Sequence, residues 1–141
     1  MAFEAFTPSW AEAWAEELNT SLGYRAAAEK WEGAVALVLD HPDPEAQRAV
    51  ILDLWHGNCR SAAVADPDAA RAAAAYVFQG GPDAWRDVLC NGGSPLMALM
   101  TGKIRLAKGS LTALLPYAQA AKELLELAGR VPTTFPKVME A

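Results

Sequence analysis

The sequence predicts a fold in which helices at both ends of the chain flank an antiparallel sheet. Two stretches with apolar residues every three or four positions come first, and short apolar runs rich in Val and Leu follow. The first pattern is typical of amphipathic helices, whereas the second, bounded by Gly, Pro and Asn, is typical of strands. Because 141 residues is a common size for one domain, we expect a single core within residues 1–141.

The N-terminal segment is predicted to form a helical hairpin. Residues 7–12, TPSWAE, contain the cap, the first-turn proline and the S-x-x-E spacing of a helix start. The apolar stripe of this first helix comprises Trp10, Trp14, Leu18 and Leu22. Gly23 ends this helix, and a shorter helix over residues 24–31 ends at Gly33. Trp10, Trp14 and Trp31 are therefore expected in the core.

Three strands are predicted to follow as an antiparallel meander. AVALVLD, residues 34–40, is a continuous apolar run that ends at the turn sequence HPDP. RAVILDLWHGN, residues 48–58, repeats this pattern, and CRSAAVA, residues 59–65, is a weaker third run. Alternation along the second strand places Asp53 and Trp55 on one face. Its opposite, buried face comprises Val50, Leu52 and Leu54.

The next segment, DAARAAAAYVFQGG at residues 68–81, contains conflicting signals. Alanine has the highest helix propensity, whereas the letters YVFQ favour a strand. Composition alone favours a helix over this segment.

Two short helices and a further strand are expected after it. Pro82-Asp83 begins a helix with Trp85 on its apolar face, and Ser94-Pro95 begins another over residues 95–100. KIRLA, residues 103–107, alternates basic and apolar side chains, as a half-exposed strand does.

The C-terminal part is predicted to contain a helix that is interrupted near Pro116. Proline deep in a helix removes a hydrogen bond, so we expect one turn over residues 111–115 and a main helix over residues 116–128. The expected buried stripe comprises Leu114, Ala118, Ala121, Leu125 and Ala128. The tail from residue 130 to residue 141 is expected to be extended.

Composition excludes several function classes. A net charge of -5 argues against a nucleic-acid partner, because such proteins cluster Lys and Arg to neutralise phosphates. The hydrophobic fraction of 52% is too high for a disordered chain. No apolar run approaches the length of a membrane span, and the start MAFEAF lacks the pattern of a signal peptide. A cytoplasmic location is the expectation.

The two cysteines suggest neither a disulfide framework nor a metal site. Cys59 and Cys90 are far apart in the sequence and have no cysteine neighbours. Two ligands of this kind do not make a zinc pattern, so we expect two reduced thiols and no metal.

Several stretches, taken in order, resemble the sterol carrier protein type-2 family, in particular its bacterial members. These are the strand entry Trp31-x-Gly33, LDLWHGNC, DAWRDVL, PLMALMTGKIRLAKGS and RVPTTFP, and together they span most of the chain. The most specific part is a helix followed by a glycine-lysine strand and a second glycine. It comprises Pro95, Ala98, Gly102-Lys103-Ile104 and Gly109.

The resemblance implies an α+β fold with a five-stranded, mainly antiparallel sheet that is covered by helices. It also implies an apolar tunnel between sheet and helices that holds a lipid. It further implies that AAAAYVFQ, residues 72–79, is a strand, against the composition. One departure is that Ala107-Lys108 adds a residue before Gly109, which predicts a β-bulge that shifts the mouth of the tunnel.

The implied function is non-catalytic lipid binding or transfer, without a cofactor. The ligand would be a fatty acid, an acyl-CoA or a sterol-like molecule, because such a cavity needs apolar walls and adaptable side chains such as methionine. The candidate ligand-binding residues are Leu52, Leu54, Trp85, Leu89, Leu96, Met97, Met100, Leu114, Leu115 and Ala118. Trp55 is a further candidate for the cavity rim.

Alternatives to this interpretation stay open. The Leu and Met side chains of residues 96–100 have the spacing of ordinary core, so the chain could be an accessory or interaction domain whose cavity is filled. A weaker alternative is an enzyme, because the hairpin places Cys59 near His56 and Asp53. On a tight hairpin, however, the imidazole and the thiol need not meet.

Some exposed candidates concern partners. Lys103, Arg105 and Lys108 could attract an acidic headgroup or an anionic membrane during a transient contact, although a solvated strand face is the simpler interpretation. Trp55 and Phe135 are candidates for a homodimer contact or a membrane-facing patch.

Overall fold

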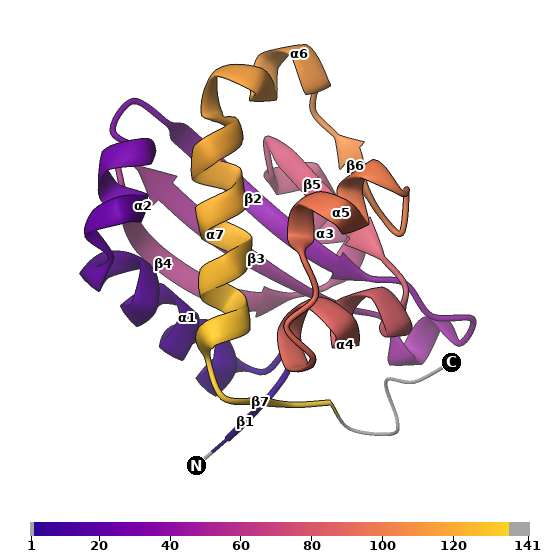
Figure 1. Ribbon diagram of the computed structural model, residues 1–141. Helices are drawn as coiled ribbons and strands as arrows, with labels where there is room; N and C mark the ends of the chain where they lie inside the picture. Colours follow the sequence, from indigo (N-terminus) through magenta and orange to yellow (C-terminus); the bar gives the residue numbers. More distant parts are fainter. Residues whose placement is uncertain (1, 136–141) are drawn as a thin grey trace.

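The computed structural model describes residues 2–135, and its centre is a five-stranded sheet (Figure 1). The strands are β2 (Glu32–Leu39), β3 (Arg48–Trp55), β4 (Asn58–Ala65), β5 (Tyr76–Gly80) and β6 (Ile104–Lys108). They are ordered β4-β3-β2-β5-β6. Within this sheet only the pairing of β2 with β5 is parallel, and the other three are antiparallel. The expected five-stranded, mainly antiparallel sheet is confirmed.

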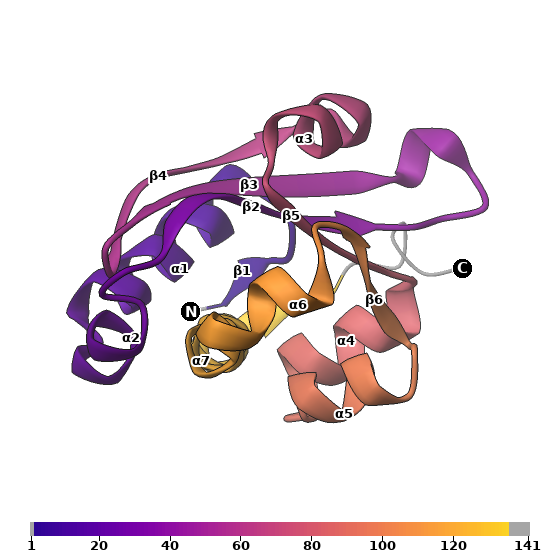
Figure 2. The same cartoon turned by 90° about the horizontal axis from the view of Figure 1, so that it is seen from above.

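Helices cover the sheet unequally (Figure 2). Of the helices in residues 2–135, one face carries α3 alone (Pro67–Ala73), whose Ala70 packs with Ala36 and Val38. The other face carries α1 (Pro8–Thr20), α2 (Leu22–Ala27), α4 (Pro82–Cys90), α5 (Pro95–Met100), α6 (Leu111–Leu114) and α7 (Ala118–Arg130). The short 3₁₀ helices are η1 (Pro44–Ala46) and η2 (Leu115–Tyr117). The parallel pair β1 (Phe3–Glu4) and β7 (Thr133–Thr134) joins the two ends of the described chain.

Most helices begin at a side-chain cap. The hydroxyls of Thr7, Ser21, Ser94 and Ser110 accept hydrogen bonds from backbone N–H groups of α1, α2, α5 and α6. Proline occupies the first turn of α1, α3, α4 and α5, where its missing N–H costs nothing. Because Ser21 caps α2, α1 ends at Thr20, and Leu22 is exposed instead of completing the predicted stripe.

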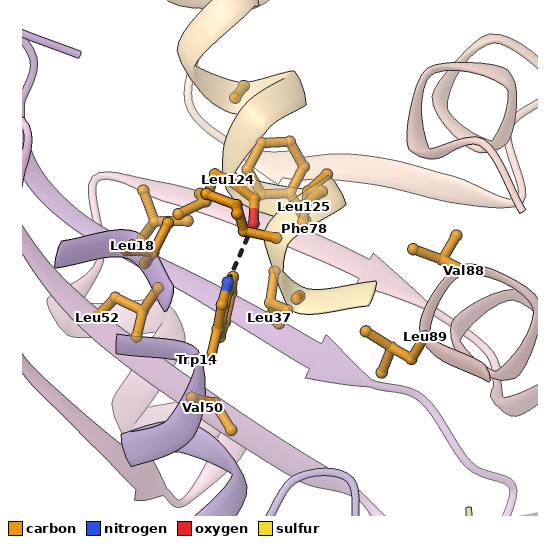
Figure 3. Close-up of a cluster of buried hydrophobic side chains, with 14 of the residues drawn as sticks. Trp14, Leu18, Leu37, Val50, Leu52, Phe78, Val88, Leu89, Leu124 and Leu125 are labelled. Carbon is orange, nitrogen blue, oxygen red and sulfur yellow. Dashed lines mark hydrogen bonds between the residues drawn. The ribbon is translucent and has the colours of Figure 1, made fainter. Parts of the chain in front are cut away.

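The core lies between the sheet and the larger helical layer. Trp14 is buried in α1, and its indole Nε1 donates a hydrogen bond to the carbonyl oxygen of Leu124 in α7, at 3.0 Å (Figure 3). Trp85 is likewise buried in α4 and donates to the carbonyl oxygen of Val38 in β2, also at 3.0 Å. These bonds satisfy the only polar atom of each ring while its apolar body fills the interior. Trp10 and Trp31 are buried as expected.

The segment that contained conflicting signals divides into two elements. Its first part belongs to α3, where Asp66 caps the first turn and the alanines are helical. Its second part is β5, which begins only at Tyr76 and pairs with β2. The prediction of one helix was therefore wrong beyond Ala73, and the strand implied over residues 72–79 was wrong before Tyr76.

The predicted bulge is present in β6. Val77 pairs with Lys108 whereas its neighbour Phe78 pairs with Leu106, so Ala107 is the extra residue. The break near Pro116 is also present, but η2 delays the start of α7 to Ala118. Ala118 is therefore the first residue of α7 and is exposed instead of buried, whereas Ala121, Leu125 and Ala128 of the predicted stripe are buried. Of the predicted extended tail, residues 136–141 lie outside the described part.

Among residues 2–135, no helix has both the length and the hydropathy that a membrane span requires.

Candidate functional site

An apolar pocket lies between α5, the α6–η2 segment and the N-terminal half of α7. Its volume is about 290 Å³. Its walls comprise Pro95, Leu96, Leu99, Met100, Leu111, Leu114, Leu115, Ala118, Ala121, Lys122 and Leu125. Leu114, Ala121 and Leu125 are buried and form its floor, where it meets the hydrophobic core. Lys122 is the one charged residue among the described residues of this lining.

Local sequence explains why the pocket stays open. Ser94 and Ser110 cap the starts of the short helices α5 and α6, and Pro116 lies in η2, which follows α6 directly. Leu and Met side chains of α5 and α6–η2 line the pocket opposite α7. The facing positions of α7 include Ala118 and Ala121, which have small side chains. Protein interiors are normally close-packed, so small residues opposite two short elements leave space that larger ones would fill.

Five of the ten candidate residues line this pocket. They are Leu96, Met100, Leu114, Leu115 and Ala118. Met97 on α5 is instead more than half exposed and lines a smaller pocket together with Lys103. The other four are buried in the packed core, on β3 and α4. They are Leu52, Leu54, Trp85 and Leu89.

Around Trp14, side chains fill the space between the sheet and the helices α1 and α7. Trp14 and Phe78 lie among leucines of α1, β2, β3 and α7 (Figure 3). The pocket therefore lies at the side of the core. Sequence reasoning missed Pro95, Leu111 and Lys122 as lining residues. It considered Leu99 together with its Leu and Met neighbours in residues 96–100, as core or as cavity wall, and it predicted Ala121 and Leu125 only as part of a helix stripe.

Solved structures of other proteins are similar to this chain in sequence and fold. A crystal structure described as sterol carrier protein 2 is 45% identical, with a TM-score of 0.80, and the match covers 91% of this chain and 99% of that one. The chain belongs to the sterol carrier protein 2 family. A solution structure of a conserved hypothetical protein from Thermus thermophilus, described as possibly a sterol carrier protein, is 43% identical with a TM-score of 0.78. That match covers 95% of this chain and 94% of the other.

More distant members of the sterol carrier protein 2 family agree in fold alone. The apo form of sterol carrier protein 2 from Yarrowia lipolytica is 17% identical, has a TM-score of 0.54, and is matched over 90% of this chain and 95% of its own. Searches of family models and of curated proteins found no match.

The Cys/His arrangement in this member of the sterol carrier protein 2 family lacks the geometry of an activated thiol. His56 Nε2 lies 2.6 Å from Glu32 Oε2, and its ring stacks on Trp55. Cys59 Sγ instead donates to the carbonyl oxygen of Ser61, at 3.3 Å. Burial, and to a smaller extent the nearby Asp53 carboxylate, raises the pKa of the Cys59 thiol to about 11. A nucleophilic thiol needs the opposite shift, since the thiolate is the reactive form.

The pKa of Cys59 predicts slow alkylation of its thiol. With a pKa of about 11, only about one hundredth of the thiol is ionised at pH 9. Below the pKa, the ionised fraction falls about tenfold for each unit by which the pH is lowered. Iodoacetamide should therefore modify exposed Cys90 first at pH 8, and Cys59 should react quickly only in denaturant. Mass spectrometry of peptides after timed alkylation checks this order. Equal rates in the folded protein would contradict the raised pKa.

Two of the three basic side chains around β6 have structural partners. Arg105 Nη1 lies 3.4 Å from Asp40 Oδ2. Lys108 Nζ donates to the carbonyl oxygens of Arg71 and Ala72, at 2.8 and 3.2 Å, near the C-terminal end of α3. Lys103 is exposed beside α5. These roles match the simpler interpretation for Arg105 and Lys108.

The two exposed aromatic candidates also have neighbours of their own. The Trp55 ring lies between His56 and the guanidinium of Arg60, which is 4.8 Å from the ring centroid. Phe135 is partly buried under Arg86, whose guanidinium carbon is 5.6 Å from its ring.

Proposed function

We propose that this protein binds and transfers lipids without catalysis, and that it holds an acyl chain in the pocket between α5, α6–η2 and α7. The observation that carries this proposal is the wall of the pocket, which is formed almost wholly by Leu, Met, Ala and Pro side chains. Lys122 is the one side chain of this lining, among the described residues, that could orient a polar group, and the rest of the surface suits a ligand without polar atoms along its length. The membership of the sterol carrier protein 2 family supports the same conclusion.

The size of the pocket limits how much of a ligand enters it as it stands. Its 290 Å³ lie just below the range of about 300–1,000 Å³ that is typical of small-molecule sites. A long acyl chain therefore requires α5 or α6–η2 to move away from α7. Both elements are short, and Met100 can change rotamer at low cost to follow a ligand.

The energetics also favour a ligand that is sheltered over most of its length. Each buried methylene contributes about 0.8 kcal/mol, and association costs at least about 4 kcal/mol. Micromolar affinity needs a net gain of about 8 kcal/mol, which corresponds to roughly 15 buried methylenes. We therefore infer a chain of about 16 carbons and a pocket that widens on binding.

Lys122 is suited to the polar end of such a ligand. It lies at the pocket wall, and its Nζ is 3.9 Å from Glu126 Oε1 in an i,i+4 pair that is partly exposed. Exposed pairs of this kind contribute little. A carboxylate or phosphate headgroup can thus replace Glu126 at the ammonium group without a large cost.

The second candidate, an interaction domain with a filled cavity, is favoured by the packed core around Trp14 and Leu52. Lipid binding by the purified protein separates the two. Organic extraction followed by mass spectrometry should release lipid in stoichiometric amount, or delipidated protein should bind a fluorescent 16-carbon fatty acid with micromolar affinity that unlabelled fatty acid competes. An empty protein that also fails to bind the probe would favour the filled domain.

A further inference from the structure

Exposed apolar side chains gather around the mouth of the pocket. Leu96, Met97, Met100, Leu111 and Leu115 are each more than half exposed. Four of them line the pocket, and Met97 lies beside them on the same short helix as Leu96 and Met100. We call these five residues the apolar rim. Large apolar side chains that are contiguous on a surface mark a contact site, whereas scattered ones do not.

The chain segment that carries the apolar rim has a charge opposite to that of the protein as a whole. Residues 91–122 contain four Lys or Arg and no Asp or Glu, although the chain has 17 acidic and 12 basic residues. Two of these lysines flank the apolar rim. Lys103 lies with Met97 at one side, in a pocket that Asp87 also lines, and Lys122 lies at the pocket wall, 3.9 Å from Glu126. Lys103 forms no ion pair with another residue in the described range 2–135.

We propose that the apolar rim docks on the surface of an anionic lipid bilayer, with the mouth of the pocket against the membrane. This inference rests on the proposed function, since it supplies the route by which a lipid enters. Leu and Met side chains would enter the headgroup boundary, and the lysines would approach anionic lipids. A lipid would then pass from the bilayer between α5 and α6–η2 without crossing water.

The charge distribution favours this one orientation. Helix α1, at the other side of α7 (Figure 2), carries Glu12, Glu16 and Glu17 and no Lys or Arg. An anionic surface therefore repels that side and attracts residues 91–122. A second copy of the chain fits the apolar rim less well, because its own basic segment would be placed against this one.

Vesicle binding tests the docking face. At low salt, wild-type protein should float with vesicles of phosphatidylcholine that contain about 30 mol% phosphatidylglycerol, and it should bind pure phosphatidylcholine at least roughly fivefold more weakly. Met97→Glu and Lys103→Glu should each weaken binding to the anionic vesicles by roughly fivefold or more. Leu22→Glu is the matched control, because Leu22 is a strongly exposed leucine outside the apolar rim, on α2. It should bind as the wild type does.

Two readouts separate this proposal from the proposed function. In vesicle-free buffer, Lys103→Glu should bind the fluorescent fatty acid as tightly as the wild type, because Lys103 does not line the pocket. If neither the wild type nor any variant binds the fluorescent fatty acid, the carrier function is rejected. If Leu22→Glu weakens vesicle binding as much as Met97→Glu does, the docking face is rejected. A wild-type dimer that Met97→Glu dissociates would also overturn it, since the apolar rim would then join two copies.

Discussion

Ala118→Trp is expected to weaken fatty-acid binding by about a hundredfold or more while the fold stays intact. Ala118 is exposed at the start of α7, and its small side chain faces the pocket that α5 and α6–η2 enclose. An indole at this position would occupy much of the 290 Å³ and leave no room for an acyl chain. Titration of delipidated protein with a fluorescent 16-carbon fatty acid should show a loss of affinity of about a hundredfold or more, or about 2.7 kcal/mol.

The matched control for this prediction is Gln119→Trp. Gln119 is the next residue, is also exposed, and does not line the pocket. Its variant should bind the probe within about threefold of the wild type, which corresponds to about 0.6 kcal/mol. If both variants bind normally, the acyl chain lies elsewhere in the protein.

Trp14→Ala is expected to lower the free energy of unfolding by about 3–5 kcal/mol. Trp14 is completely buried between α1, the sheet and α7, so its loss creates a cavity (Figure 3). The change also removes the indole N–H that reaches the carbonyl oxygen of Leu124. Domains are stable by only about 5–15 kcal/mol, so the variant would be near the limit of folding. Urea denaturation followed by circular dichroism measures the change.

Trp55→Ala provides the comparison for this effect. Trp55 has the same side chain but is 41% exposed, at the end of β3. Its loss removes a contact with Arg60 and the stacking on His56, and we expect a change below about 1 kcal/mol. Equal losses in the two variants would show that Trp14 does not hold the core together.

Much of the fold follows from local sequence signals. The caps and first-turn prolines place the starts of α1, α4 and α5, and alternation in β3 separates buried Leu52 from half-exposed Asp53. These features depend on a few neighbouring residues, so they can be predicted without knowledge of the partner elements. The division near Ala74 is different, because the helix to one side and β5 to the other are selected by packing and by pairing with β2.

The pocket was harder to predict than the elements around it. Periodicity shows that Leu54 and Leu114 both face inward, but not that Leu54 lies in a packed layer whereas Leu114, at the end of α6, lines a pocket. The exposure of Ala118 depended on where α7 begins after Pro116, because η2 makes Ala118 the first residue of α7. Which side chains meet across helices is set by tertiary packing, and a stripe on one helix does not contain this information.

The most direct test of lipid binding in this pocket uses a fatty acid labelled with ¹³C along its chain. In the complex with protein in solution, filtered NMR experiments detect which protein methyl groups lie close to the chain. We predict contacts from the chain to the methyl groups of Leu96, Leu114 and Leu125, which line the pocket. Contacts confined to other parts of the protein, or a protein whose spectrum does not change when the fatty acid is added, would contradict this prediction.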